Sequence, residues 1–257
     1  YPFVHIQPLL SSVDVVVGNL EGPIPDVHIP TESFSFGFSF PPGTAKVLAE
    51  HNIKLVSLGN NHALDQGGVG LLQTKEKLKQ SGVLFAGDPY ELGSVSVATT
   101  TLGSQEFVFI FINATYPSFQ KEKAIELVGN TSANYPRSFR IVGIHWGEEY
   151  ATTSSPAQQE LAHAFVDRGA HLIIGHHPHV VQEVEHYKNA YIFYSLGNFI
   201  FDQYFSKEVQ EGLAVKLLHG KNISLELLPY RSSRSRPRLL EGFEKEQWLA
   251  TFALKSR

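Results

Sequence analysis

The sequence lacks several residue types and patterns, and each absence removes a class of function. Its 257 residues include no cysteine, which excludes disulfides, a thiolate nucleophile and cysteine-ligated zinc. No apolar run approaches the roughly 18 to 20 residues that a membrane-spanning helix needs. Lys and Arg number 21 against 25 Asp and Glu, a formal net charge of −4. The chain therefore has no basic field to attract nucleic acid, and we expect no nucleic-acid partner.

Methionine is absent as well, and the chain opens at Tyr1. Without an initiator residue, the sequence is expected to be a fragment that lacks its true N-terminus. Its composition, 42% hydrophobic and 18% charged, is that of an ordinary globular protein. We therefore expect residues 1–257 to form a single, N-terminally truncated domain.

Strand and helix signals alternate along the chain. Short β-branched or apolar runs predict strands, and apolar residues at helical spacing predict helices. This alternation predicts an α/β sheet. The alternating phenylalanines of residues 34–40 predict one apolar face that belongs to the core, and residues 231–238 predict a solvated basic turn. The predicted strands are 13–17, 53–58, 83–85, 107–112, 139–144, 172–174, 191–194 and a closing pair within 212–229; the predicted helices are 44–50, 71–79 and one from about 156 to 168.

Polar side chains follow four of the predicted strands at the point where each strand ends. Ligands of open α/β sheets bind at the carboxyl ends of the strands, so we expect these segments to meet in space. Gly175-His176-His177-Pro178-His179 gives the strongest signal of a functional site. Three imidazoles in four residues would repel one another if protonated, unless a metal ion binds them or solvent surrounds them. The four groups are Asn19 and Glu21; Asn60, Asn61, His62 and Asp65; His145 and Glu148; and His176, His177 and His179.

Imidazoles, carboxylates and carboxamides without thiolates suit a divalent ion used for chemistry, such as Zn, Mn or Fe. The spread over several strands allows one ion, or two that share a carboxylate. Ser195 does not sit in a Gly-x-Ser-x-Gly elbow, and neither a dinucleotide-binding nor a P-loop motif occurs. The other histidines are expected to be surface or core residues: His5, His28, His51, His163, His171, His186 and His219.

Six segments together resemble one protein family. They are Asn19-Leu20-Glu21-Gly22; Ser57-Leu58-Gly59-Asn60-Asn61-His62 with Asp65; His145-Trp146-Gly147-Glu148-Glu149-Tyr150; Pro156 with Gln159; Gly175 to Gln182; and Tyr194 to Gln203. Their order and content resemble the CapA family, also called PgsA, of bacterial poly-γ-glutamate capsule synthesis proteins. The likeness runs from about residue 1 to residue 230.

The resemblance implies a calcineurin-like metallophosphoesterase fold, a four-layer α/β/β/α sandwich. It also implies a protein at the extracellular face of the bacterial cell membrane, anchored by a segment upstream of the chain and working with membrane-embedded capsule synthesis subunits. The implied catalytic residue is His62, as proton donor to a leaving group. The implied metal ligands are Glu21, Asn61, His145, His177 and His179, and further candidates are Asn19, Asn60, Asp65, Glu148, His176 and Asn198.

The chain departs from the family pattern at its start. The family opens with a strand ending in Gly-Asp, whose Asp is a metal ligand, and no such segment precedes Tyr1. Two functions remain open on this basis. One is a metal-dependent hydrolase or transferase that acts on a phosphoester or on poly-γ-glutamate. The other is a non-catalytic assembly or polymer-binding subunit of the capsule synthesis complex.

Overall fold

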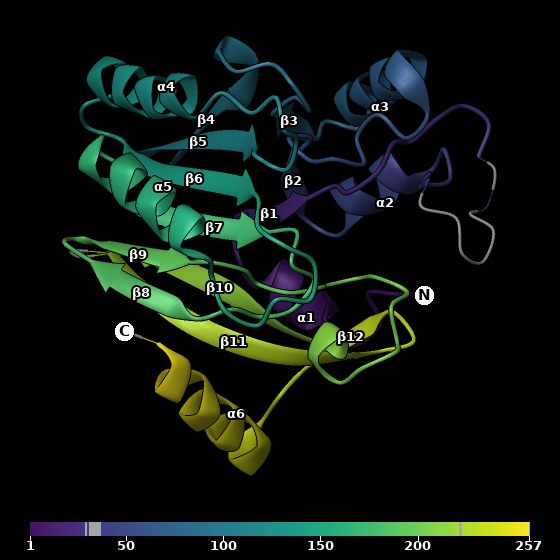
Figure 1. Cartoon of the computed structure of the whole chain (residues 1–257). Helices are drawn as coiled ribbons and strands as arrows, with labels where there is room; N and C mark the ends of the chain where they lie inside the picture. The colour runs from purple at the N-terminus through teal and green to yellow at the C-terminus, as the bar shows by residue number, and fades with distance from the viewer. Residues whose placement is uncertain (29, 31–36, 221–222, 257) are drawn as a thin grey trace.

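The structure is a computed structural model that describes residues 1–28, 30, 37–220 and 223–256. Within these residues the strands form one six-stranded and two three-stranded sheets, with helices packed around them (Figure 1). The molecule therefore has the mixed α/β architecture that the alternating pattern predicts.

The first three-stranded sheet is parallel, in the order β1-β2-β3. Its strands and three helices enclose a core that includes Ile24, Leu58 and Leu78. Strand β1 starts three residues later than predicted. The side-chain amide of Asn52 donates a hydrogen bond to the carbonyl of Val13, so this carbonyl does not pair with a neighbouring strand. The elements are α1 (Gln7–Ser11), β1 (Val16–Asn19), α2 (Thr44–Glu50), β2 (Ile53–Ser57), α3 (Gly67–Gln80) and β3 (Leu84–Ala86).

The six-stranded sheet has the order β4-β5-β6-β7-β9-β8. Its central strands run parallel, and the edge strands β4 and β8 are antiparallel to their neighbours. Helices α4 and α5 lie on one face of this sheet (Figure 1). The elements are the 3-10 turn η1 (Ser94–Ser96), β4 (Val97–Leu102), β5 (Gln105–Asn113), α4 (Lys121–Asn134), β6 (Phe139–His145), α5 (Pro156–Asp167), β7 (Leu172–His176), β8 (Val184–Tyr187) and β9 (Ala190–Phe193).

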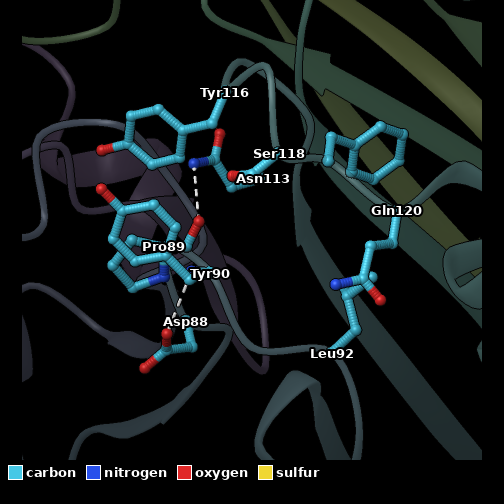
Figure 2. A pocket seen from close by; sticks show the side chains of 9 residues that line it. Asp88, Pro89, Tyr90, Leu92, Asn113, Tyr116, Ser118 and Gln120 are labelled. Atoms are coloured by element: carbon cyan, nitrogen blue, oxygen red, sulfur yellow. Dashed lines mark hydrogen bonds between the residues drawn. The ribbon is translucent and has the colours of Figure 1, made fainter.

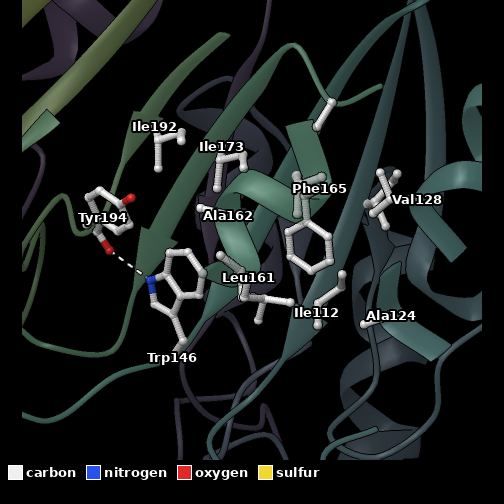
Figure 3. Packing of buried hydrophobic residues seen from close by; sticks show 14 of the residues in the cluster. Ile112, Ala124, Val128, Trp146, Leu161, Ala162, Phe165, Ile173, Ile192 and Tyr194 are labelled. Atoms are coloured by element: carbon white, nitrogen blue, oxygen red, sulfur yellow. Dashed lines mark hydrogen bonds between the residues drawn. The ribbon is translucent and has the colours of Figure 1, made fainter. Parts of the chain in front are cut away.

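Helix α5 illustrates how sequence builds this layer. Pro156 occupies its first turn, and Ser155 and Gln158 cap it reciprocally, side chain to backbone, which satisfies amides that a helix start leaves unpaired. Phe165 of α5 is fully buried against the sheet together with Trp146 and Ile173 (Figure 3). The indole Nε1 of Trp146 donates to the carbonyl of Tyr194 at 2.9 Å, so this core also has its polar atom paired.

The third sheet is antiparallel, in the order β10-β11-β12. It packs against the other face of the six-stranded sheet through a core that joins Phe109 and Ile141 to Leu213. Figure 1 places α6 on the far side of this third sheet. The elements are the 3-10 turn η2 (Glu208–Gln210), β10 (Glu211–His219), β11 (Ile223–Ser233), β12 (Arg236–Leu239) and α6 (Gly242–Lys255).

Two local predictions differ from the structure. Phe34 and Phe36 lie outside the described residues, while Phe38 and Phe40 belong to an irregular segment and not to a strand. Residues 231–238 are not simply a solvated turn, because they form the β11–β12 hairpin. Arg231 and Arg238 both pair with Glu244 of α6, so the basic residues attach the C-terminal helix.

Candidate functional site

The strand ends converge because of the sheet register. His145, the last residue of β6, pairs directly with His176, the last residue of β7, and Asn19 at the end of β1 pairs with Ser57 of β2. A Cβ at Gly175 would lie 1.9 Å from the carbonyl oxygen of Tyr194. Only glycine therefore lets β7 run this close to the next strand before the histidine cluster begins.

One group of donors joins Glu21, Asn61 and His145. The imidazole Nε2 of His145 lies 2.8 Å from the Asn61 side-chain oxygen and 3.8 Å from Glu21 Oε1. His145 is only 1% exposed. The three side chains come from the ends of β6, β2 and β1, so residues far apart in the sequence face a common point.

A second group joins His177, His179 and Glu149. One potential ligand atom from each lies within 4.8 Å of the other two. Glu21 connects the two groups, because the same Oε1 that lies near His145 is 3.6 Å from Nε2 of His179. The arrangement has the form of two adjacent donor sets with one carboxylate between them.

Burial favours the neutral form of three histidines in this region, His145, His176 and His177. Desolvation, followed by the neighbouring imidazoles, holds the pKa of His145 well below its usual value. Desolvation lowers the pKa of His176 to about 4, and desolvation with the His179 charge lowers that of His177 to about 4. Desolvation raises the pKa of Glu21 against the opposing influence of His179. A neutral imidazole is the form that binds a metal ion.

Three polar atoms in this cluster are buried and have no hydrogen-bond partner within the described part of the chain. They are Glu21 Oε1, His145 Nδ1 and His177 Nδ1. Orphaned buried polar atoms are rare and require an explanation, such as a missing ion or water. Nitrogen and oxygen donors with neutral imidazoles are a set that Zn, Mn or Fe accepts, so the residues present fit a divalent ion.

His62 sits beside the cluster in a different arrangement. Its Nδ1 lies 2.8 Å from Asp65 Oδ2, and the same carboxylate oxygen accepts the backbone amide of Phe38 at 2.7 Å. The Phe38 ring packs on the imidazole with centroids 4.2 Å apart. A carboxylate at Nδ1 fixes the ring and leaves Nε2 for a reaction partner. Phe38, predicted as core, is thus a wall of this site.

Three predicted asparagines, Asn19, Asn60 and Asn198, support the cluster from outside. Asn60 is fully buried and donates to the Asn19 side chain and to the carbonyl of Leu20, while Asn19 donates to Glu21 Oε2 at 2.9 Å. Asn198 Oδ1 lies 2.7 Å from His179 Nδ1. These amides hold the carboxylate and the imidazole in place.

Glu148 was named from the sequence as a further candidate, and Glu149 was not. Glu149 joins the donor group with His177 and His179, and the structure puts Glu148 in no such group among the described residues. Gly147, two residues beyond the end of β6, has a φ of +84°. Two adjacent acidic residues gave no sequence signal for which of them would lie beside His177 and His179.

A small pocket is lined by residues that include Tyr90, Asn113 and Tyr116 (Figure 2). Tyr90 and Tyr116 stack within it, with ring centroids 4.6 Å apart, and the Tyr116 hydroxyl donates to the backbone carbonyl of Asn61 at 2.9 Å. Burial, followed by the charge of Tyr90, raises the pKa of Tyr116 to about 12. The phenol therefore remains a neutral donor that fixes the Asn61 backbone.

Comparison with known proteins identifies the family of this chain. Residues 1–203 match the model of the bacterial capsule synthesis protein family PGA_cap. The chain belongs to that family. Capsule biosynthesis protein CapA of Bacillus anthracis is 31% identical over 258 residues, covering 93% of this chain and 63% of that protein. PGA biosynthesis protein CapA of Bacillus subtilis is 30% identical over 224 residues, covering 78% and 57%. The chain thus spans about three fifths of the length of these relatives.

Solved structures show a related fold. A hypothetical protein from Thermus thermophilus aligns with a TM-score of 0.59 at 17% identity, covering 88% of this chain and 92% of that chain. A candidate 5′-nucleotidase from Staphylococcus aureus, crystallised with α-ketoglutarate, aligns with a TM-score of 0.50 at 15% identity, covering 81% and 43%. At these identities the likeness concerns the fold alone. Among the described helices of this PGA_cap chain, none is long and apolar enough to cross a membrane.

Proposed function

We propose that this chain acts in the synthesis of a poly-γ-glutamate capsule and that its strand-end cluster is a metal-dependent hydrolase site. The observation that carries the proposal is the set of buried, orphaned atoms of Glu21, His145 and His177 at one point of the structure. Membership of the PGA_cap family supports the biological role. The structural likeness to the candidate 5′-nucleotidase supports the finer fold assignment. This assignment is a single domain with a four-layer α/β/β/α sandwich of the calcineurin-like type.

In this proposal the two donor groups hold one or two divalent ions. Asn61 and His145 serve one position, His177, His179 and Glu149 serve the other, and Glu21 lies between them. A divalent ion there acts as a Lewis acid and offsets negative charge that develops on the scissile group. In this proposal the ion also attracts the anionic phosphoester or polyglutamate substrate, because the proposed ligands include the carboxylates Glu21 and Glu149 and no lysine or arginine.

His62 is the residue proposed to move a proton. Asp65 holds Nδ1 and would stabilise the imidazolium, which leaves Nε2 to protonate a departing oxygen or nitrogen. The Phe38 ring covers one side of the imidazole and limits the water that can reach it. We further propose that the full-length protein works at the extracellular face of the cell membrane with membrane-embedded capsule synthesis subunits.

Three variants of the full-length protein test the proposal. We expect His179→Ala to lower the content of bound Zn or Mn, measured by elemental analysis, and to abolish capsule in a strain that carries it. His62→Ala should keep its metal and still reduce both capsule quantity and hydrolysis of a chromogenic phosphodiester. His186→Ala is the matched control, because His186 is exposed on β8. Normal capsule from folded His62→Ala would reject catalysis by this residue and favour an assembly subunit.

A further inference from the structure

The loop that follows β6 is tied to the histidine turn that follows β7. Tyr150 has a φ of 65°, and its backbone amide donates to the carbonyl of Pro178 at 2.8 Å. His177 and His179 also adopt positive φ, 97° and 60°. A left-handed conformation costs a non-glycine residue roughly 1–2 kcal/mol, so three such residues at one place need strong contacts to hold them.

Those contacts include the side chain of Tyr150. Its hydroxyl oxygen accepts a hydrogen bond from Gln203 Nε2 at 3.0 Å. Its ring lies against His179 with centroids 6.0 Å apart and meets Phe205 edge-on at 5.1 Å. Burial raises the pKa of Tyr150, and so does Glu149, through its charge and a hydrogen bond. Tyr150 thus contacts one proposed ligand, His179, through its ring and is held by Gln203 through its hydroxyl.

Gln203 continues the connection to Asn198, the partner of His179 Nδ1. Its Oε1 accepts from Asn198 Nδ2 at 3.1 Å, and the same amide nitrogen donates to the carbonyl of Val209 at 3.2 Å. Two acceptors therefore fix the Asn198 amide so that its oxygen faces His179 Nδ1 at 2.7 Å. An oxygen at that position requires the proton on Nδ1, which leaves the Nε2 lone pair directed to the Glu21 side of the site.

We propose that Tyr150, Gln203 and Asn198 form a positioning network that selects the Nδ1–H tautomer of His179 and keeps Glu149 beside it. The network acts through the two side chains it holds and does not touch substrate. This inference rests on the proposed metal site and adds to it the residues that set its geometry. Outer partners of metal-binding imidazoles typically change metal affinity about 10- to 100-fold when they are removed.

The first test is the protonation of His179 in the ion-free protein, which needs no metal. Nitrogen NMR shifts should show Nδ1 protonated and Nε2 unprotonated in the wild type. In Gln203→Leu, the Asn198 amide loses one of its two fixed acceptors, and the signals should move towards a mixture of tautomers. A wild-type protein in which Nε2 carries the proton would overturn the network, whatever the metal site does.

The second test uses Co²⁺, whose visible spectrum reports ligand geometry. Tyr150→Phe keeps the ring but removes the hydroxyl, so Co²⁺ binding should weaken about tenfold or more with an altered spectrum. Gln203→Leu should do the same, Gln203→Glu should partly restore binding, and the double variant should lose little more than either single one. Tyr204→Phe is the matched control, because the Tyr204 hydroxyl bonds to Ser235 instead.

The two failures differ in outcome. If the wild type binds no Co²⁺, the proposed metal site is wrong and the Glu149 part of the inference falls with it, while the NMR result decides the tautomer alone. If the wild type binds Co²⁺ and folded Tyr150→Phe binds it with the same affinity and spectrum, the metal site stands and the positioning network is rejected.

Discussion

The segments that enter and leave β7 each carry a histidine whose pKa is lowered to about 4, yet the two imidazoles are in opposite situations. Before the strand, the backbone amide of Arg140 lies 3.0 Å from His171 Nδ1 and the Arg140 guanidinium lies 3.0 Å from Nε2; the neutral imidazole accepts a hydrogen bond at one of these two nitrogens. After the strand, His177 Nδ1 is buried without a hydrogen-bond partner in the described residues. The first imidazole has a protein donor beside each ring nitrogen, whereas Nδ1 of the second has no hydrogen-bond partner among the described residues.

The difference separates a structural histidine from a binding one even though desolvation is the largest cause of both pKa shifts. His171 is held by a residue of the neighbouring strand and packs against Phe139. His177 faces the rings of His145 and His179. A lowered pKa alone therefore does not identify a site; the unpartnered ring atoms do.

The largest expected effect is the loss of stability when Arg140, the partner of His171 before β7, is replaced. Arg140 is buried and donates to the carbonyls of Gly169, Tyr135 and Ser138 as well as contacting His171. Arg140→Met should lower the free energy of unfolding by about 3 kcal/mol, because removing a donor costs roughly 1–3 kcal/mol for each buried acceptor left unpaired. Urea denaturation measures the loss. The exposed Arg137→Met should stay within about 0.5 kcal/mol of the wild type, and an equal loss in both would contradict the assignment.

The sequence predicted the histidines that follow β7 as a site, but it did not predict the pairing of His171 with Arg140 before β7. Gly175 to His179 stood out because several imidazoles follow a predicted strand, and parallel register explains why they meet His145. The Arg140–His171 pair left no comparable signal, since the two residues are far apart in sequence and neither belongs to a motif. Pattern shows where strands end, but pairing across strands depends on register and packing.

The choice between Glu148 and Glu149 shows a second limit. Strand periodicity ends at His145, and the direction of each side chain beyond it depends on backbone angles at Gly147 and Tyr150. The roles of Asn198 and Phe38 were hidden for the same reason, because both act through three-dimensional contacts with His179 and His62. The sequence located the segments of the site but not the orientation of their side chains.

A metal titration should sharpen the comparison with an effect of intermediate size. Zn²⁺ at 100 times its dissociation constant should raise the free energy of unfolding of the wild type by about 2.7 kcal/mol, since it binds only the folded state. His177→Ala should respond much less at the same concentration, whereas His171→Asn should respond fully. Differential scanning fluorimetry with and without a chelator makes the measurement. Equal stabilisation of His177→Ala and the wild type would place the ion elsewhere.

The smallest expected effect is a loss of stability at acidic pH that reports on His171. Because its folded pKa of about 4 lies below the unfolded value near 6.5, the unfolded chain takes up the proton first as pH falls. The associated stability is complete above pH ~6.5 and is lost between pH ~6.5 and ~4. From pH 7 to pH 5.5 the wild type should lose about 1 kcal/mol more than His171→Asn, which keeps an acceptor for the Arg140 amide but cannot titrate. Unfolding in urea at the two pH values, with Zn²⁺ present to occupy the histidines at the other end, gives this difference. Identical pH dependence in the two proteins would mean that burial and the Arg140 charge do not hold His171 neutral.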